Sequence, residues 1–319
     1  QIDGQIFTNN GIGNFNAAAS AGVAASSMDV SGGGGVGTLI FAGDVSTGSL
    51  SLGTNGLLAG AGTLTVNGPV SWTAGTLGNA TAAGTTVIAA TGSLNMSGVF
   101  NKSLSRVLEN HSPSASWTDG HLLFTNATFN NQSDGTFTAT PATSLIFSHQ
   151  SGTNLFHNAG TFIQNGPGTV TVGVSSNNTG TVNVQAGTLQ ISGSGTSSGE
   201  FEVDPGTTLN FAGTTFTHDA ASSVTNHGTL GLGGGTNILA GALTSDGIVN
   251  ITGTATLNAD YSLSGPVNLT GTLGGSGRTT ITGPMNWTGG AMSGTGTTVI
   301  APTGSLNMSG VFNKSLSRV

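Results

Sequence analysis

A turn signature recurs along this chain at an interval that suits one coil of a β-solenoid. Each turn places Asn or Asp close to a Gly, and Thr or an apolar residue follows. Successive glycines of the signature lie 19 to 26 residues apart, at Gly135, Gly160, Gly180, Gly206, Gly228 and Gly247. Asn-Gly corners suit a chain that turns where φ is positive. The recurrence predicts stacked coils of roughly 20 to 25 residues each, the period of a solenoid repeat.

The segments between these turns alternate like half-buried strands. In "TVNVQA", Val182 and Val184 alternate with Thr181 and Asn183, and no helical period is present. Thr and Val favour strands, and alternation sends the apolar set inward and the hydroxyls and amides outward. Because each coil lies on the one before it, neighbouring strands are expected to be parallel. The predicted fold is all-β, a parallel β-helix (β-solenoid).

A coarser repeat of about 212 residues is superimposed on the coils. Residues 303–319 are identical to residues 91–107, and "GPMNWTGGAM" at 283–292 is similar to "GPVSWTAGTL" at 68–77. The second copy therefore begins near residues 271–283. We expect residues 37–319 to form a continuous solenoid, after a weakly patterned lead-in or first irregular coils over residues 1–36. The most polar stretch, residues 100–121, is predicted to be an irregular coil with a looped-out side.

The composition excludes several classes of function. Charged residues make up 5% of the chain, against about 25% in ordinary domains. The net charge of −7 and the five basic residues argue against nucleic acid as a partner. The chain has no cysteine, and no apolar stretch approaches a membrane span, so no membrane insertion is expected in this segment. A chain that starts at Gln1 reads as a mature or excised piece, and a secreted precursor is the expected source.

One acidic cluster raises the possibility of chemistry. In "GEFEVDPG", Glu200, Glu202 and Asp204 alternate with Phe201 and Val203. Strand geometry places the three acids on one outer face, where they could share a cation or form the acid patch of a sugar-cleaving β-helix. The alternative is a solvated strand face over inward Phe and Val side chains. We predict no catalytic residue and no cofactor, and leave these acids as candidate metal ligands.

The tryptophans and threonines offer candidates for binding. All tryptophans share one phrase, "SWT" or "NWT", and they could stack on sugar rings if exposed or fill the core if buried; they are Trp72, Trp117 and Trp287. Outward Thr-X-Thr pairs could form a flat hydroxyl array of the ice-binding type, or simply reflect the strand preference of Thr. The pairs are Thr63/Thr65, Thr136/Thr138 and Thr169/Thr171.

The strand openings "GTFIQNG", "GTVNVQAG" and "GTLGLGGG" resemble those of bacterial surface proteins of the autotransporter and filamentous-haemagglutinin-like type. This resemblance covers most of the chain from about Leu50 onward. It implies a right-handed parallel β-helix, a cell-surface or secreted location, and a structural or adhesive role.

These observations predict a non-enzymatic, extracellular β-solenoid that forms a filament, fibre or adhesive stalk. Its expected partners are other copies of itself, joined as tandem repeats, end to end, or both, because an uncapped solenoid end exposes unpaired strand edges. Surface glycans are a further possible partner. An ice- or glycan-binding module is the first alternative, and a carbohydrate-active β-helix enzyme is the second.

Overall fold

The computed structural model describes residues 5–9, 12–15, 23–32, 35–79 and 84–319. Over these ranges the chain forms strands and turns and no helix. It builds a parallel β-solenoid of about 14 coils of about 20 residues, which confirms the predicted fold class. The coils divide into two compact units, unit 1 over Gln1–Ile163 and unit 2 over Gln164–Val319. No helix in the described ranges is long and apolar enough to cross a bilayer.

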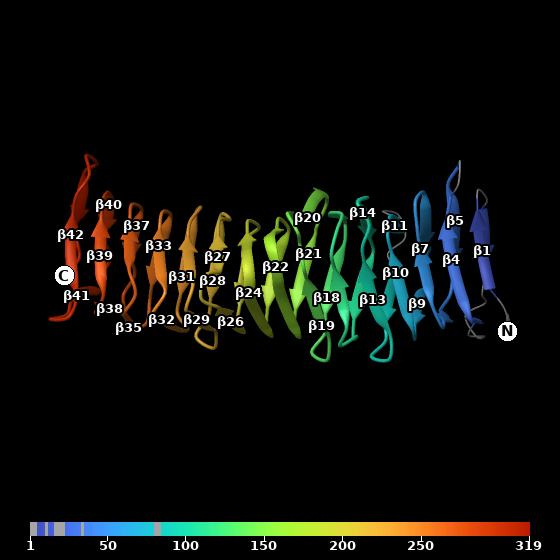
Figure 1. Ribbon diagram of the computed structural model, residues 1–319, viewed down its shortest axis with the longest axis horizontal. Helices are drawn as coiled ribbons and strands as arrows, with labels where there is room; N and C mark the ends of the chain where they lie inside the picture. Colours follow the sequence, from blue (N-terminus) through green and yellow to red (C-terminus); the bar gives the residue numbers. More distant parts are fainter. Residues whose placement is uncertain (1–4, 10–11, 16–22, 33–34, 80–83) are drawn as a thin grey trace. The chain divides into compact units, whose positions relative to one another are not determined.

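In unit 1, each coil contributes three strands. One coil contains β13 (Ser93–Met96), β14 (Lys102–Ser105) and β15 (Val107–Asn110). The next contains β16 (Ala115–Trp117), β17 (Leu122–Thr125) and β18 (Thr128–Asn131). Each strand pairs in parallel with its counterpart one coil later, so β13 pairs with β16, β14 with β17 and β15 with β18. Figure 1 shows the strands of successive coils of the unit side by side, with β13, β14 and β18 labelled.

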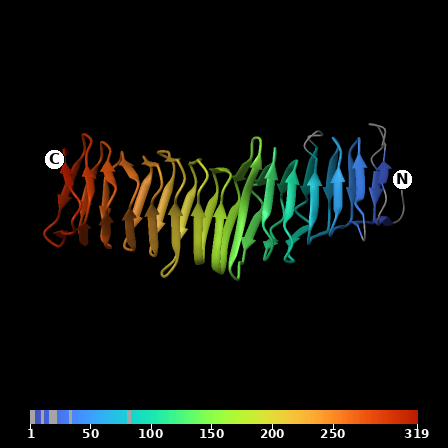
Figure 2. The same ribbon diagram turned by 90° about the horizontal axis from the view of Figure 1, so that it is seen from above.

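Unit 2 repeats this plan. One of its coils contains β26 (Glu200–Val203), β27 (Thr208–Phe211) and β28 (Thr215–His218). The following coil contains β29 (Ser223–Asn226), β30 (Thr229–Leu232) and β31 (Thr236–Leu239), and the three pairs are again parallel. The turned view in Figure 2 shows the coils of the unit following one another as similar rungs.

The lead-in expected over residues 1–36 lies partly outside the described residues. Within it, β1 (Gln5–Asn9) pairs in parallel with β4 (Ser27–Ser31). Two more strands, β2 (Ile12–Phe15) and β3 (Val23–Ala25), pair with β5 (Gly37–Phe41) and β6 (Val45–Thr47). The described part of the segment therefore takes the same parallel pairing as the coils that follow.

Clusters of aromatic side chains lie in the core of each unit, among a larger number of aliphatic side chains. In unit 1, Trp117 and a group of phenylalanines from successive coils contact one another, with the Trp117 and Phe147 ring centroids 4.8 Å apart. In unit 2, Phe201, Phe211 and Phe216 surround His218. Strict alternation directs these rings inward, as in β26, where Phe201 and Val203 are buried and Glu200 and Glu202 exposed.

A buried asparagine ladder connects three coils of unit 1. The Asn110 amide Nδ2 donates to Asn131 Oδ1 over 2.8 Å, and Asn131 Nδ2 donates to Asn158 Oδ1 over 2.7 Å. All three side chains are buried, at the last positions of β15, β18 and β21 (Leu155–Asn158). Buried amides are tolerated where partners satisfy them, so the ladder depends on the coils being in register.

The glycines of the turn signature serve a different purpose from the one predicted. Of the six, only Gly206 has a positive φ, of 81°. At Gly228, a Cβ would lie 2.5 Å from the Thr207 carbonyl oxygen and closer still to that of Asp204. At Gly247, a Cβ would clash with the Gly228 carbonyl oxygen of the coil before. The corners need glycine mainly because successive coils approach too closely there for a side chain.

This difference gives a matched pair of substitutions in unit 2. Gly228→Ala is expected to lower the free energy of unfolding by about 3 kcal/mol, because backbone oxygens must move to admit the methyl group. Gly206→Ala is expected to lower the free energy of unfolding by only about 1 to 2 kcal/mol. No described atom lies within 4 Å of the Cβ that alanine would add, so only the positive φ opposes the substitution. Urea denaturation of both variants checks the order, and a larger cost at Gly206 would contradict the close-approach explanation.

The two copies of the coarse repeat have the same local structure. In the first, β10 (Pro69–Trp72) pairs with β13; in the second, β39 (Pro284–Trp287) pairs with β42 (Ser305–Met308). Arg106 Nη2 donates to the carbonyls of Gly62 and Thr85, and Arg318 Nη2 donates to those of Gly277 and Thr297.

Residues 100–121 do not form the irregular coil that their polarity suggested. They contain β14, β15 and β16, each paired in parallel with the coil before and the coil after. The prediction was wrong because the two cations of this stretch point inward. Lys102 and Arg106 are buried, and backbone carbonyls accept their hydrogen bonds.

Candidate functional site

The predicted acidic cluster lies on an outer face of unit 2. Glu200 and Glu202 are exposed on β26, and Asp204 follows the strand and is half-buried. Across the described ranges, no group of three or more His, Cys, Asp or Glu side chains is arranged to hold a metal ion. The cluster thus has the exposed, alternating placement of a solvated strand face.

The three tryptophans lie in the core. Trp72, Trp117 and Trp287 end β10, β16 and β39, and each is at most 3% exposed. Trp117 Nε1 donates to the Gly120 carbonyl over 2.7 Å. The Nε1 atoms of Trp72 and Trp287 have no hydrogen-bond partner among the described residues. All three rings are therefore buried and not open to a sugar.

The Thr-X-Thr pairs named from the sequence lie on three separate strands. Thr63/Thr65 lies on β9 (Thr63–Val66), Thr136/Thr138 on β19 (Thr136–Ala139) and Thr169/Thr171 on β22 (Thr161–Val172). The column that contains Thr65 continues with Val87 and Glu109. The column through Thr65 is therefore not a continuous array of hydroxyls.

A threonine column does occur in unit 2, where inspection of the sequence missed it. It runs through β28, β31, β34 (Thr254–Leu257) and β37 (Thr272–Gly274), and its members are Thr215, Thr236, Thr254 and Thr272. Its neighbouring outward column is mixed, because Ile238 and Gly274 interrupt it. The coil length changes from 21 to 18 residues along the column, so a fixed period does not reveal it.

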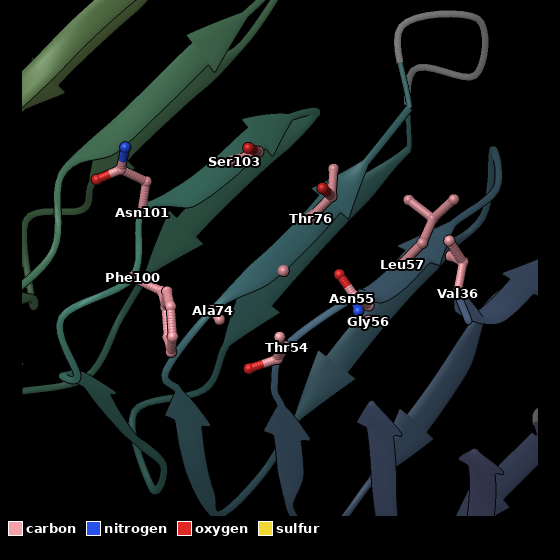
Figure 3. A pocket seen from close by; sticks show the side chains of 11 residues that line it. Val36, Thr54, Asn55, Gly56, Leu57, Ala74, Thr76, Phe100, Asn101 and Ser103 are labelled. Atoms are coloured by element: carbon pink, nitrogen blue, oxygen red, sulfur yellow. The ribbon is translucent and has the colours of Figure 1, made fainter. Parts of the chain in front are cut away.

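Unit 1 carries an open groove across three successive coils. Its floor is formed by β8 (Gly56–Ala59), β11 (Gly75–Gly78) and β14, and its volume is about 420 Å³. Figure 3 shows Phe100 at one side, beside Ala74, and Val36 at the other, beside Leu57. We call it the Phe100 groove; its lining residues are Val36, Thr54, Asn55, Gly56, Leu57, Ala74, Gly75, Thr76, Phe100, Asn101 and Ser103.

The Phe100 groove is uncharged but rich in hydrogen-bonding groups. None of its 11 lining side chains is ionisable, while hydroxyls and amides come from Thr54, Asn55, Thr76, Asn101 and Ser103. Apolar contact comes mainly from Phe100 and Val36, which are 58% and 57% exposed. A mixture of apolar walls and a few polar groups is typical of small-molecule sites.

A buried lysine fixes the loop that carries Phe100. Lys102 Nζ donates to the carbonyls of Gly98, Phe100 and Asp119 over 3.3, 3.2 and 2.9 Å. The side chain is fully buried, and that burial lowers its pKa to about 8, against the opposing effect of Asp119. Burying an ammonium is unfavourable unless acceptors compensate it, and here two of the three acceptors, Gly98 and Phe100, belong to the exposed loop.

Comparison with protein-family models, with curated proteins and with solved structures finds no significant match for this chain. The likeness in strand openings to bacterial autotransporter and haemagglutinin-like proteins is thus supported at the level of fold, the parallel β-solenoid, and not by a family match.

Proposed function

We propose that this protein is a structural, non-enzymatic solenoid that elongates by adding coil upon coil, and that it forms an extracellular filament or adhesive stalk. The observation that carries the proposal is that one sequence occurs in two structural settings. Residues 91–107 lie inside unit 1 with coils on both sides, whereas the identical residues 303–319 form the last coil of unit 2.

The two settings differ in how far the same apolar side chains are exposed to solvent. Leu94, Met96 and Leu104 are at most 1% exposed, because β16 and β17 cover them. Their counterparts Leu306, Met308 and Leu316 are 40%, 59% and 65% exposed. Together with Trp287 and Met292 they line an open hollow of about 290 Å³. Apolar side chains exposed at a sheet edge favour burial by a further coil.

An outward amide column supports the same direction of growth. Asn268 Nδ2 donates to Asn250 Oδ1 over 2.8 Å, and Asn286 Nδ2 donates to Asn268 Oδ1 over 3.0 Å. Asn307, on β42, continues the column with a longer contact of 3.4 Å to Asn286. Stacked amides that repeat with the strand spacing stabilise assemblies built strand on strand. The backbone edge and the amide column of β42 are both suited to accept a further strand.

The low charge and the absence of cysteine are compatible with the proposed extracellular location and with a surface that binds neutral partners. The strand openings shared with bacterial surface proteins favour a secreted structural or adhesive role. We propose self-association through coil ends or covalent tandem repeats as the principal interaction.

The test appends residues 108–131 of this chain directly after Val319. That segment covers residues 91–107 in unit 1, so we expect it to fold onto β41 (Thr297–Ile300), β42 and β43 (Lys314–Leu316). Hydrogen exchange of the amides in β42 should slow by at least about tenfold, because opening the last coil would then expose apolar surface. A chain extended with the same residues in scrambled order is the control.

Electron microscopy tests the filament itself. A tandem chain with two successive copies of residues 91–302 should appear as longer, unbranched particles of unchanged width, and long thin fibres of the single chain would support end-to-end stacking. Equal exchange in the extended and scrambled chains, together with particles that do not lengthen, would overturn the proposed function.

A further inference from the structure

The exposed apolar loop of the repeat is built identically twice. In the first copy the loop contains Val99 and Phe100, which are 74% and 58% exposed. In the second, Val311 and Phe312 are 94% and 72% exposed. Gly98 and Gly310 both have positive φ, of 78° and 80°. Two neighbouring apolar residues are thus held in solvent by the same backbone in both copies.

The loop keeps this shape because a lysine beneath it holds its carbonyls. Lys314 Nζ donates to the carbonyls of Gly310 and Phe312 over 3.4 and 3.1 Å, as Lys102 does to those of Gly98 and Phe100. In the first copy Lys102 is fully buried, and the desolvation of its ammonium is unfavourable unless these carbonyls compensate it. The arrangement presents an aromatic ring at low conformational cost, which favours binding by preorganisation.

The residues that line the Phe100 groove, beside the first of these loops, indicate which class of ligand would fit there. Phe100 supplies an aromatic face, and hydroxyls and amides of Thr76, Asn101 and Ser103 lie across neighbouring strands of the same surface. A ligand with both an apolar face and many hydroxyl groups matches this combination. Because no lining side chain is ionisable, an acidic ligand would find no counter-charge in the groove.

We infer that the Phe100 groove binds a neutral oligosaccharide, with one sugar ring stacked on Phe100 and its hydroxyls bonded to the threonine, serine and asparagine side chains. The groove is open at the surface and crosses three coils, so it admits a segment of a linear chain rather than an enclosed small molecule. This binding is independent of coil stacking at the end of unit 2, because every lining residue lies in unit 1.

Saturation-transfer NMR on the full chain tests the inference. The probes are cellohexaose, xylohexaose, maltohexaose and N-acetylchitohexaose, with hexagalacturonate as the anionic comparison. We expect at least one neutral hexaose to bind and Phe100→Ser to weaken it by about tenfold, the loss of one aromatic stacking contact. Hexagalacturonate should show no saturation transfer.

Phe312→Ser is the matched control. Phe312 is carried by an identical loop, but it lies beside Gly289, and Ala291 replaces the hydroxyl of Thr76. We expect this variant to bind the same hexaose within about twofold of the parent chain.

Failure of all four neutral hexaoses to bind, unchanged binding by the Phe100→Ser chain, or an equal loss in Phe312→Ser would overturn the assignment. Self-association that disappears in Phe100→Ser, measured by light scattering without any sugar binding, would show instead that the loop contacts a second copy. Circular dichroism of both variants confirms folding, because both phenylalanines are exposed.

Discussion

Replacing Trp117 with alanine is expected to lower the free energy of unfolding by about 3 to 5 kcal/mol. The side chain is fully buried and contacts Phe137 and Phe147, with ring centroids 6.3 and 4.8 Å away. Its Nε1 also donates to the Gly120 carbonyl. Alanine would leave a cavity between coils that cannot collapse without breaking the pairing of β16 with β13 and β19. Urea denaturation followed by circular dichroism measures the loss.

Trp72→Phe is the informative control for this prediction. Trp72 belongs to the same sequence phrase and is 1% exposed, but its Nε1 has no hydrogen-bond partner in the described part of the chain. Phenylalanine removes that unsatisfied donor while keeping most of the ring, so we expect a change within about 1 kcal/mol. If Trp72→Phe costs as much as Trp117→Ala, the energetic role assigned to the Trp117 contacts is wrong.

Acid is expected to destabilise unit 2 through His218. The ring is buried against Phe201, Phe211 and Phe216, with centroid distances of 5.6, 4.8 and 4.9 Å. Neither ring nitrogen has a hydrogen-bond partner among the described residues. Burial lowers the pKa of His218 to about 4, and Asp219 opposes this only in part.

The sign of the pH effect follows from the lowered pKa. The unfolded chain binds a proton near pH 6.5, whereas the folded chain resists it until about pH 4. Stability is therefore complete above about pH 6.5 and falls as the pH drops from there to about 4, by about 3 kcal/mol. Urea denaturation at a series of pH values checks the slope.

His218→Leu should remove most of this acid sensitivity and raise stability at every pH, because an apolar side chain replaces one with two unsatisfied nitrogens. His227→Asn is the control, since the His227 side chain is 42% exposed and bonds to Asp246 at the surface. An unchanged acid response in His218→Leu would show that other groups govern the pH dependence.

The sequence contains enough local information to predict the strands and which of their faces is buried. Alternation in "EFEV" correctly places Phe201 and Val203 inside, because side-chain direction in a strand depends only on position parity. The parallel stacking could also be predicted, because a single coil buries too little apolar surface to be stable alone and must pack on its neighbours.

Features that depend on contacts with a neighbouring coil cannot be predicted from the local sequence. Asn131 looks like a surface amide, and only its register with Asn110 and Asn158 explains its burial. The polarity of residues 100–121 suggested an irregular coil, yet Lys102 is buried, and carbonyls of its own coil and of the next coil accept its hydrogen bonds. The Phe100 groove was missed for the same reason, because its lining residues come from separate coils.

The carbonyl contacts at the corner glycines have a consequence for how such a chain can vary over evolutionary time. At a corner such as Gly247 the backbone packs directly against the Gly228 carbonyl of the preceding coil. The backbone path at this corner therefore depends on the path of the coil before it. Insertions there would displace every later coil, whereas a bulge directed into solvent leaves the stack undisturbed. Insertions and deletions that distinguish duplicated segments should therefore occur mainly in loops that point into solvent. Larger changes in length should add or remove whole coils.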